Sequence, residues 1–244
     1  MVTRMAAGQD NVPRYEILRD ERAAPSVHGY LHRPATASGD GIVLTHGAGS
    51  NAQAPLLVAL AEALAARGLV VLRCDLPYRQ VRRFGPPGPG DAACDRAGLK
   101  NALAVMRELA PGRVLLGGHS YGGRQATMLC AAESGLVEGL LLLSYPLHPP
   151  RKPEQLRTKH LAHLRNPSLF VHGTRDPFGT AEEMERALRL IPAKTGLLMV
   201  DGAGHDLDFR KGTAGQELIE KIVSALQEFT EREPKTSSDP SSFR

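Results

Sequence analysis

The amino-acid sequence predicts an α/β fold: a doubly wound, mostly parallel sheet of about seven to eight strands with helices on both faces. Two observations carry this prediction. Short, continuous apolar runs recur along the 244 residues, and segments with helical spacing separate them. Strands that are buried on both faces of a parallel sheet are continuously apolar rather than alternating. A chain of this length buries roughly 70–75% of its unfolded surface, which is enough for one large domain.

Six apolar runs are the predicted parallel strands, at residues 41–47, 68–74, 113–118, 138–144, 167–173 and 195–202. Two earlier runs, around residues 14–19 and 27–32, are expected to add antiparallel edge strands. Between the parallel strands, apolar residues recur with helical spacing. The predicted helices cover residues 54–67, 95–109, 122–134, 180–191 and 216–230.

The chain shows no internal repeat and no linker, so one domain is expected over residues 14–232. Residues 1–13 are expected to form a flexible N-terminus. Residues 233–244 are polar and rich in proline and serine, which predicts a disordered tail.

Composition excludes several function classes. The net charge is +4, but no Lys/Arg block carries interleaved aromatic residues, so no nucleic-acid partner is expected. The spacing of Cys74, Cys94 and Cys130 indicates neither a disulfide framework nor a zinc site, and we expect no metal and no cofactor. Free thiols suit a reducing compartment. The first thirty residues lack the apolar core of a signal peptide, and no apolar stretch is long enough for a membrane span, so we expect a cytoplasmic protein without a membrane partner. The oligomeric state stays open.

The stretch "GGHSYGG" at residues 117–123 follows a predicted strand and precedes a predicted helix. It lacks the Gly-Lys-Ser/Thr of a P-loop and the third glycine of a dinucleotide fingerprint. Gly118 to Gly122 instead read G-x-S-x-G, the pattern of a strained turn that presents a nucleophilic serine, Ser120. The small residues two positions before and after this serine let strand and helix pass closely.

A serine nucleophile needs a base and an acid, which follow it along the chain in this fold class. Asp176 lies in "HGTRDP", after the predicted strand 167–173, and His205 lies in "GAGH", after the strand 195–202. The rivals are His148 for the base and Asp201, Asp206 or Asp208 for the acid, but only Asp176 follows a separate strand.

With these three motifs in order, the sequence resembles the α/β-hydrolase superfamily over about residues 14–230. Only about twenty residues separate "SYPLHPP" from the next strand, which leaves no room for a large cap domain. The plan is therefore similar to the capless, dienelactone-hydrolase-like branch. Segments such as "THGAGSN", "DLPYRQ" and "GGHSYGGR" are similar to a group of hydrolases that includes a domain of some chromatin-complex subunits. Dienelactone hydrolases carry a cysteine at the turn, whereas this chain has Ser120.

The predicted roles follow from this chemistry. Ser120 attacks a carbonyl carbon, His205 moves the proton, and Asp176 orients the imidazole. The backbone N–H groups of Tyr121 and Ala48 are expected to form the oxyanion hole, with Gly49 as second choice for Ala48 and with His46 and Gly47 shaping the loop. His119 is expected to pack beside the sheet.

The substrate pocket is expected to involve Gly49, Tyr78, Arg79, Tyr145, Leu147 and His148. The arginines Arg79, Arg82 and Arg83 lie on the predicted catalytic side and are candidates for attracting an acidic substrate. We therefore expect a serine hydrolase that acts on small carboxylic esters or thioesters through an acyl-enzyme, with a small-molecule ester as its partner. The alternatives are a retired hydrolase fold that serves as a scaffold, or a peptidase or amidase with the same triad.

Overall fold

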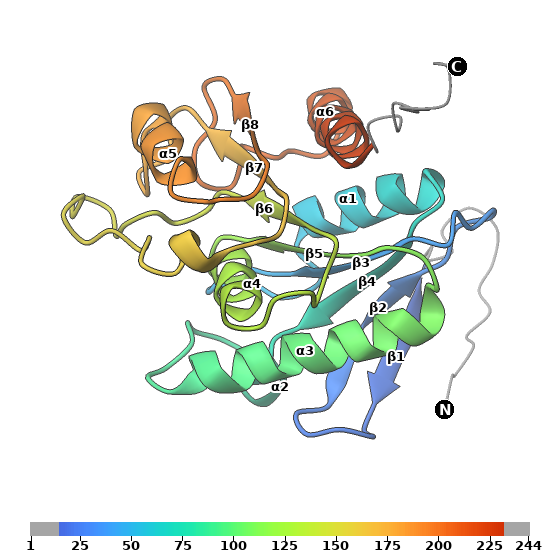
Figure 1. The fold of residues 1–244 in the computed structure, drawn as a ribbon. Helices are drawn as coiled ribbons and strands as arrows, with labels where there is room; N and C mark the ends of the chain where they lie inside the picture. Colours follow the sequence, from blue (N-terminus) through green and yellow to red (C-terminus); the bar gives the residue numbers. More distant parts are fainter. Residues whose placement is uncertain (1–14, 232–244) are drawn as a thin grey trace, which may run out of the picture.

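The computed structural model describes residues 15–231, which surround one eight-stranded sheet (Figure 1). The strand order is β1-β2-β4-β3-β5-β6-β7-β8. The strands are β1 (Glu16–Asp20), β2 (Val27–His32), β3 (Gly41–Thr45), β4 (Val70–Asp75), β5 (Val114–His119), β6 (Gly139–Leu143), β7 (Ser168–Gly173) and β8 (Thr195–Val200). Only the β1–β2 and β2–β4 pairs are antiparallel. The predicted fold class and both early strands are confirmed. The predicted flexible segment 1–13 and tail 233–244 lie outside the described residues.

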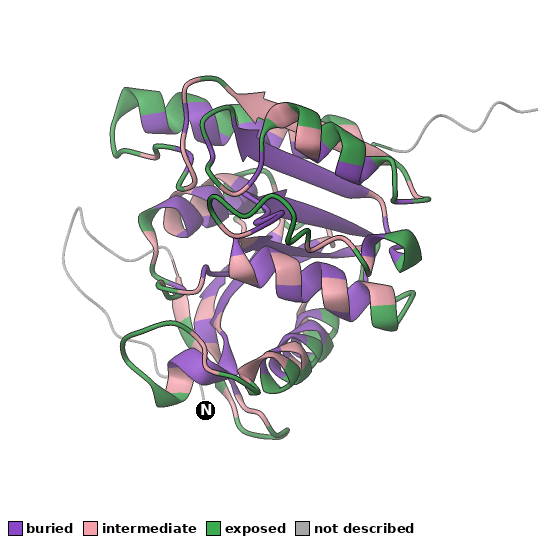
Figure 2. Cartoon of the chain, turned by 90° about the vertical axis from the view of Figure 1, so that its left-hand side faces the viewer, coloured by how far each residue is buried: buried purple, intermediate pink, exposed green. Residues whose placement is uncertain are grey.

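Helices cover both faces of this sheet, with the strands buried between them (Figure 2). Helices α1 and α6 pack on one face, and α3, α4 and α5 pack on the other. This arrangement explains why the central strands are apolar at successive positions: Leu115 faces α1 and α6, whereas Leu116 faces the opposite layer. The helices are α1 (Pro55–Ala66), α2 (Pro77–Val81), α3 (Asp91–Leu109), α4 (Tyr121–Ala132), α5 (Ala181–Leu188) and α6 (Thr213–Thr230).

Two connections matter for access to the sheet's carboxyl edge. Residues 77–81, expected as part of a loop, form the short helix α2 because Pro77 at its first turn has a backbone angle already suited to a helix. Between β6 and β7, residues 144–167 contain only a short 3₁₀ turn, η1 (Leu161–His163). No cap domain therefore covers this edge.

No helix in the described range has both the length and the apolar character needed to cross a membrane.

A buried cation sits next to a buried histidine where β2 meets β4. Arg73 is fully buried, its guanidinium lies 5.2 and 5.0 Å from the ring centres of Tyr15 and Tyr30, and its Nε donates to His32 Nε2 at 2.9 Å. Burial, and then the neighbouring Arg73 charge, lower the pKa of His32 to about 4. His32 therefore stays neutral in the folded protein at pH 7 and serves as an acceptor.

We expect acid to destabilise the fold through His32. Its pKa is about 4 when folded and near the ordinary 6.5 when unfolded, so between these values the unfolded chain binds more protons. The free energy of unfolding should fall by about 2–3 kcal/mol between pH 7 and pH 4 from this group. Urea titrations of wild type and His32→Gln measure the effect, since glutamine keeps an acceptor for Arg73. The exposed His163→Gln is the control. Parallel pH profiles for wild type and His32→Gln would contradict the assignment.

Candidate active site

The glycine-rich turn joins β5 to α4 and holds Ser120 in a strained conformation. Ser120 has φ 50° and ψ −114°, a region that residues with a side chain rarely occupy. Strand and helix approach closely on both sides of it. A Cβ added to Gly118 would lie 2.5 Å from the Gly123 nitrogen, and one added to Gly122 would lie 2.6 Å from the His46 carbonyl oxygen. Steric exclusion thus accounts for the glycines around the serine.

The structure brings Ser120, His205 and Asp176 together in one line of hydrogen bonds. Ser120 Oγ lies 2.8 Å from His205 Nε2. His205 Nδ1 lies 3.0 and 2.8 Å from the two carboxylate oxygens of Asp176. With Nδ1–H donating to the carboxylate, Nε2 is free to accept the serine proton. None of the rival histidines or aspartates takes either position.

Sheet topology is what places these three side chains at one edge. They follow β5, β7 and β8, whose carboxyl ends meet at the same side because β5 to β8 are parallel neighbours. This edge is where open α/β sheets hold their ligands.

Two residues around Asp176 were missed by sequence reasoning. Phe178 stacks on the His205 ring, with centres 4.0 Å apart, and its N–H donates to Asp176 at 2.9 Å. His172 is fully buried, donates from Nε2 to the Gly179 carbonyl at 2.8 Å, and places Nδ1 3.8 Å from the Asp176 carboxylate. Both side chains therefore fix the orientation of the acid and the base, but neither has a spacing that sequence could have singled out.

His119 fixes the loop that carries His205. Its Nε2 donates to the His205 carbonyl oxygen at 2.9 Å. Burial is the main cause that lowers the pKa of His119. The expected packing role beside the sheet thus takes a specific form: a hydrogen bond that fixes the backbone of His205.

The loop at residues 46–50 lies beside the serine and is held by buried donors. Tyr78 Oη donates to the carbonyl oxygens of Ala48 at 2.7 Å and Gly47 at 3.2 Å. Arg79 donates to Ser50 at 2.7 Å and to Ala48 at 3.4 Å, and its remaining N–H groups bind carbonyls of residues 82 and 85. Tyr78 and Arg79 are buried, so the structure assigns them to the loop rather than to a substrate.

The remaining arginines of that segment, Arg82 and Arg83, are exposed, and Arg82 pairs with Asp91. Arg83 is the exposed arginine of this loop without an ion pair among the described residues, and attraction of an acidic substrate by the loop stays a prediction. Arg79 has carbonyl partners for its donors, and Arg82 has a carboxylate partner.

Three more predicted pocket residues prove to be buried. Tyr145 and Leu147 belong to the apolar core, where Tyr145 packs edge-on against Phe170. His148 Nε2 lies 3.2 Å from Glu183. These side chains tie the segment after β6 to its neighbours and do not form an open acyl pocket as expected, because continuous packing leaves them almost no free surface. Gly49 is exposed, and its place in a substrate pocket stays a prediction.

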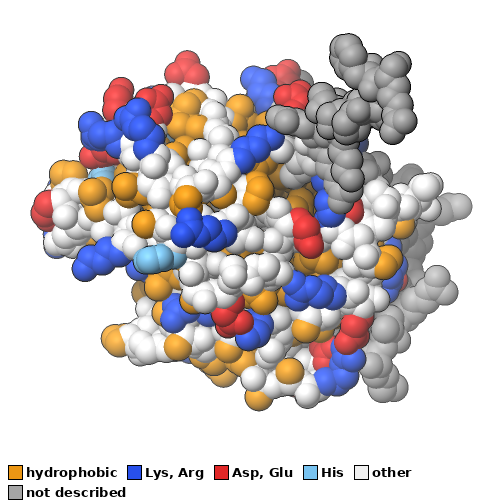
Figure 3. All heavy atoms as spheres, viewed as in Figure 1, with side chains coloured by type: hydrophobic (Ala, Val, Ile, Leu, Met, Phe, Trp, Pro, Cys, Tyr) orange, Lys and Arg blue, Asp and Glu red, His pale blue; other side chains and the backbone are white. Residues whose placement is uncertain are grey.

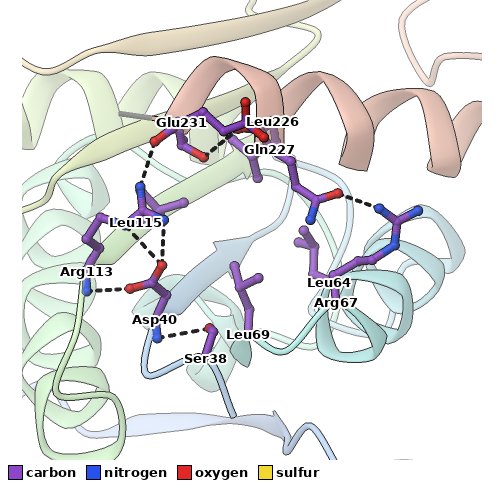
Figure 4. A pocket seen from close by; sticks show the side chains of 11 residues that line it. Ser38, Asp40, Leu64, Arg67, Leu69, Arg113, Leu115, Leu226, Gln227 and Glu231 are labelled. Carbon is purple, nitrogen blue, oxygen red and sulfur yellow. Dashed lines mark hydrogen bonds and ion pairs between the residues drawn. The ribbon is translucent and has the colours of Figure 1, made fainter. Parts of the chain in front are cut away.

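A hollow of about 390 Å³ borders the site on the α1 side. Positions 46, 47 and 50 of the loop line it, together with the start of α1, His119 and the segment after His205. Leu56, Leu57 and Phe209 form its apolar walls. Its volume is within the range of small-molecule sites. A second hollow, of 470 Å³, lies at the other end of the strands, where β3 and β5 begin. There Asp40 and Arg113 form an ion pair and point toward one another (Figure 4). The strands separate it from Ser120.

Other site types find no support among residues 15–231. No group of His, Cys, Asp and Glu side chains in that range has the geometry to hold a metal ion. On the face seen in Figure 3, basic, acidic and hydrophobic side chains are interspersed rather than gathered into one patch.

Comparison with known proteins agrees with this geometry. A family model described as an alpha/beta hydrolase domain matches residues 39–231. Dienelactone hydrolase from Anabaena variabilis is 22% identical, with a TM-score of 0.68 over 88% of this chain and 98% of that one. Est1E from Butyrivibrio proteoclasticus is 16% identical, with a TM-score of 0.68 over 87% and 98%. A serine hydrolase without lid from Xanthomonas campestris is 14% identical, with a TM-score of 0.66 over 91% and 96%.

Substituting Gly122 should destabilise the protein, because the new Cβ would meet the His46 carbonyl oxygen and the Thr45 side chain, both at 2.6 Å. We expect Gly122→Ala to lose about 1–3 kcal/mol of unfolding free energy in urea. The matched control is Gly49→Ala, where no atom lies within 4 Å of the added Cβ and the change should stay within about 0.5 kcal/mol. A wild-type midpoint for Gly122→Ala would contradict the close approach.

Proposed function

This chain belongs to the alpha/beta hydrolase domain family, in its capless branch, and on that premise we propose that it is a serine hydrolase of small carboxylic esters or thioesters. The observation that carries the proposal is the line of hydrogen bonds from Ser120 through His205 to Asp176. Nucleophile, base and orienting acid lie within the distances that acyl transfer requires.

The proposed reaction passes through an acyl-enzyme. Ser120 Oγ attacks the carbonyl carbon while its proton passes to His205 Nε2, and the imidazolium is stabilised by Asp176. His205 then returns the proton to the departing alcohol or thiol. Water repeats the sequence and releases the acid. Phe178, stacked on the imidazole, keeps the ring aligned through both halves of the reaction.

The oxyanion is proposed to accept hydrogen bonds from the backbone N–H groups of Tyr121 and Ala48. Tyr121 is the first residue of α4, and N–H groups in the first turn of a helix lack an intrahelical acceptor. Ala48 lies in the loop that Tyr78 and Arg79 hold through its carbonyls. Each such donor is worth about 3–4 kcal/mol of transition-state stabilisation.

The capless edge and the size of the adjacent hollow support small substrates. Residues 144–167 place no helical domain over the carboxyl edge, and the 390 Å³ hollow offers apolar walls at Leu56, Leu57 and Phe209. One short apolar arm of an ester fits such a space.

Replacing the nucleophile tests the proposal directly. We expect wild type to hydrolyse 4-nitrophenyl acetate and butyrate, and Ser120→Ala to lose roughly 10³-fold or more in kcat. A fluorophosphonate probe should label wild type and leave Ser120→Ala unlabelled. Failure to label Ser120 together with background rates would favour the scaffold alternative. Faster turnover of matched 4-nitroanilides than of esters would instead indicate an amidase.

Loosening the 46–50 loop should slow the chemical step. Tyr78→Phe removes the hydroxyl that binds the Ala48 and Gly47 carbonyls while it keeps the ring in the core. We expect kcat for 4-nitrophenyl butyrate to fall roughly tenfold with KM changed little, which corresponds to about 1.4 kcal/mol of transition-state stabilisation. The midpoint of thermal unfolding checks that the fold is intact. A wild-type kcat would argue against Ala48 as an oxyanion donor.

A further inference from the structure

Two arginines lie on the α4 side of the sheet, the face opposite the one that α1 covers. Arg124 lies one turn beyond Ser120 on α4, and its N–H donates to the Ser120 carbonyl oxygen at 3.0 Å. Arg157 belongs to the segment between β6 and β7. Its N–H donates to the Leu147 carbonyl at 2.7 Å, and its Nη1 donates to the Pro146 carbonyl at 3.3 Å. Both side chains are only partly exposed.

Hydrogen bonds place these two arginines on one surface. Thr127 is three residues beyond Arg124 and shares its face of α4. Thr127 Oγ1 lies 2.9 Å from His160 Nε2, so the 157–160 segment packs against that face. Tyr145 Oη donates to the Arg157 carbonyl at 2.8 Å and lies 3.5 Å from the same histidine nitrogen.

The charges of this surface act on each other. Burial, and then the positive charge of Arg124, lower the pKa of Arg157, and the same two causes lower the pKa of His160 to about 4. His160 is half-buried and hydrogen-bonded to Thr127, and with this lowered pKa it is neutral at pH 7. Two fixed positive charges therefore lie close together.

No carboxylate offsets these charges within residues 15–231. Neither Arg124 nor Arg157 forms an ion pair there, and Arg124 Nε is buried without a hydrogen-bond partner. Arg113, by contrast, pairs with Asp40. A guanidinium cannot lose its proton near neutral pH, so its partial burial without a carboxylate partner is costly. A bound anion would offset this cost.

We propose that Arg124 and Arg157 bind a carboxylate on the substrate, so that the preferred substrate is a monoester or thioester of a dicarboxylic acid. Paired guanidinium groups match the two oxygens of a carboxylate. The Cα of Arg124 lies about 6 Å along the helix axis from that of Ser120, and helical side chains lean toward the N-terminus. In this proposal, the carboxylate end of a short acyl chain on the serine reaches Arg124, and Arg157 lies on the segment packed against the same face of α4. The identity of the reactive bond rests on the proposed hydrolase function.

The kinetic test compares two substrates that differ in one charge, 4-nitrophenyl hydrogen glutarate and 4-nitrophenyl pentanoate. Wild type should favour the glutarate ester. Arg124→Gln and Arg157→Gln should each lower kcat/KM for that ester roughly tenfold or more, while the pentanoate value changes less than about threefold. Arg157→Lys should recover part of the preference because it keeps the charge. Arg189→Gln, an exposed arginine at the C-terminal end of α5 and outside this surface, is the matched control.

A binding test separates this proposal from the hydrolase function. Glutarate should raise the thermal midpoint of Ser120→Ala, and the rise should vanish when Arg124→Gln is added, whereas glutaramide should have no effect in either protein. Equal losses for both esters in the arginine variants, or no protection by glutarate, would overturn the carboxylate site. If neither ester is cleaved and the fluorophosphonate does not label Ser120, the hydrolase proposal fails. The thermal shift with glutarate still shows whether Arg124 and Arg157 bind a carboxylate.

Discussion

The unfavourable backbone conformation of Ser120 is the constraint from which the site follows. Holding a non-glycine residue at φ 50° and ψ −114° costs on the order of 1–3 kcal/mol. That cost is offset only if the strand before the serine and the helix after it are packed firmly. The backbone contacts at Gly118 and Gly122 and the bond from Ser120 N–H to the Leu143 carbonyl at 2.8 Å provide this support. The hydroxyl consequently stands at the carboxyl edge in one fixed direction.

The loops around the serine are held by buried polar groups rather than by a cap. Tyr78 fixes the 46–50 loop, His119 fixes the backbone of His205, and His172 and Phe178 fix the acid loop. Tyr78, His119 and His172 each use a side chain on a helix or strand to bind a loop carbonyl, whereas Phe178 uses its own backbone N–H to bind the Asp176 carboxylate. Preorganised donors of this kind need little rearrangement as charge develops. A site built this way can remain open to solvent and still keep its geometry.

Much of this structure could be predicted because its signals are local. Continuous apolar runs indicated the parallel strands, and the order of Ser120, Asp176 and His205 indicated which loops would meet. The substrate-facing residues could not be predicted in the same way. Arg79 and Tyr145 follow strands at the carboxyl edge, as pocket residues do, but whether such side chains turn outward or into the protein depends on packing between segments distant in sequence. The same ambiguity hid Arg124 within an apolar helix.

The α1 side and the α4 side of the site differ in chemical character, which would orient the proposed substrate. On the α1 side, the hollow offers Leu56, Leu57 and Phe209. On the α4 side, Arg124 and Arg157 present charge without a carboxylate among the described residues. An ester with one apolar and one acidic arm can satisfy both flanks in only one direction across Ser120. In the proposed reaction, the oxyanion would then point in a single direction, toward the proposed donors Tyr121 N–H and Ala48 N–H. Binding of the two arms would thereby orient the reacting carbonyl.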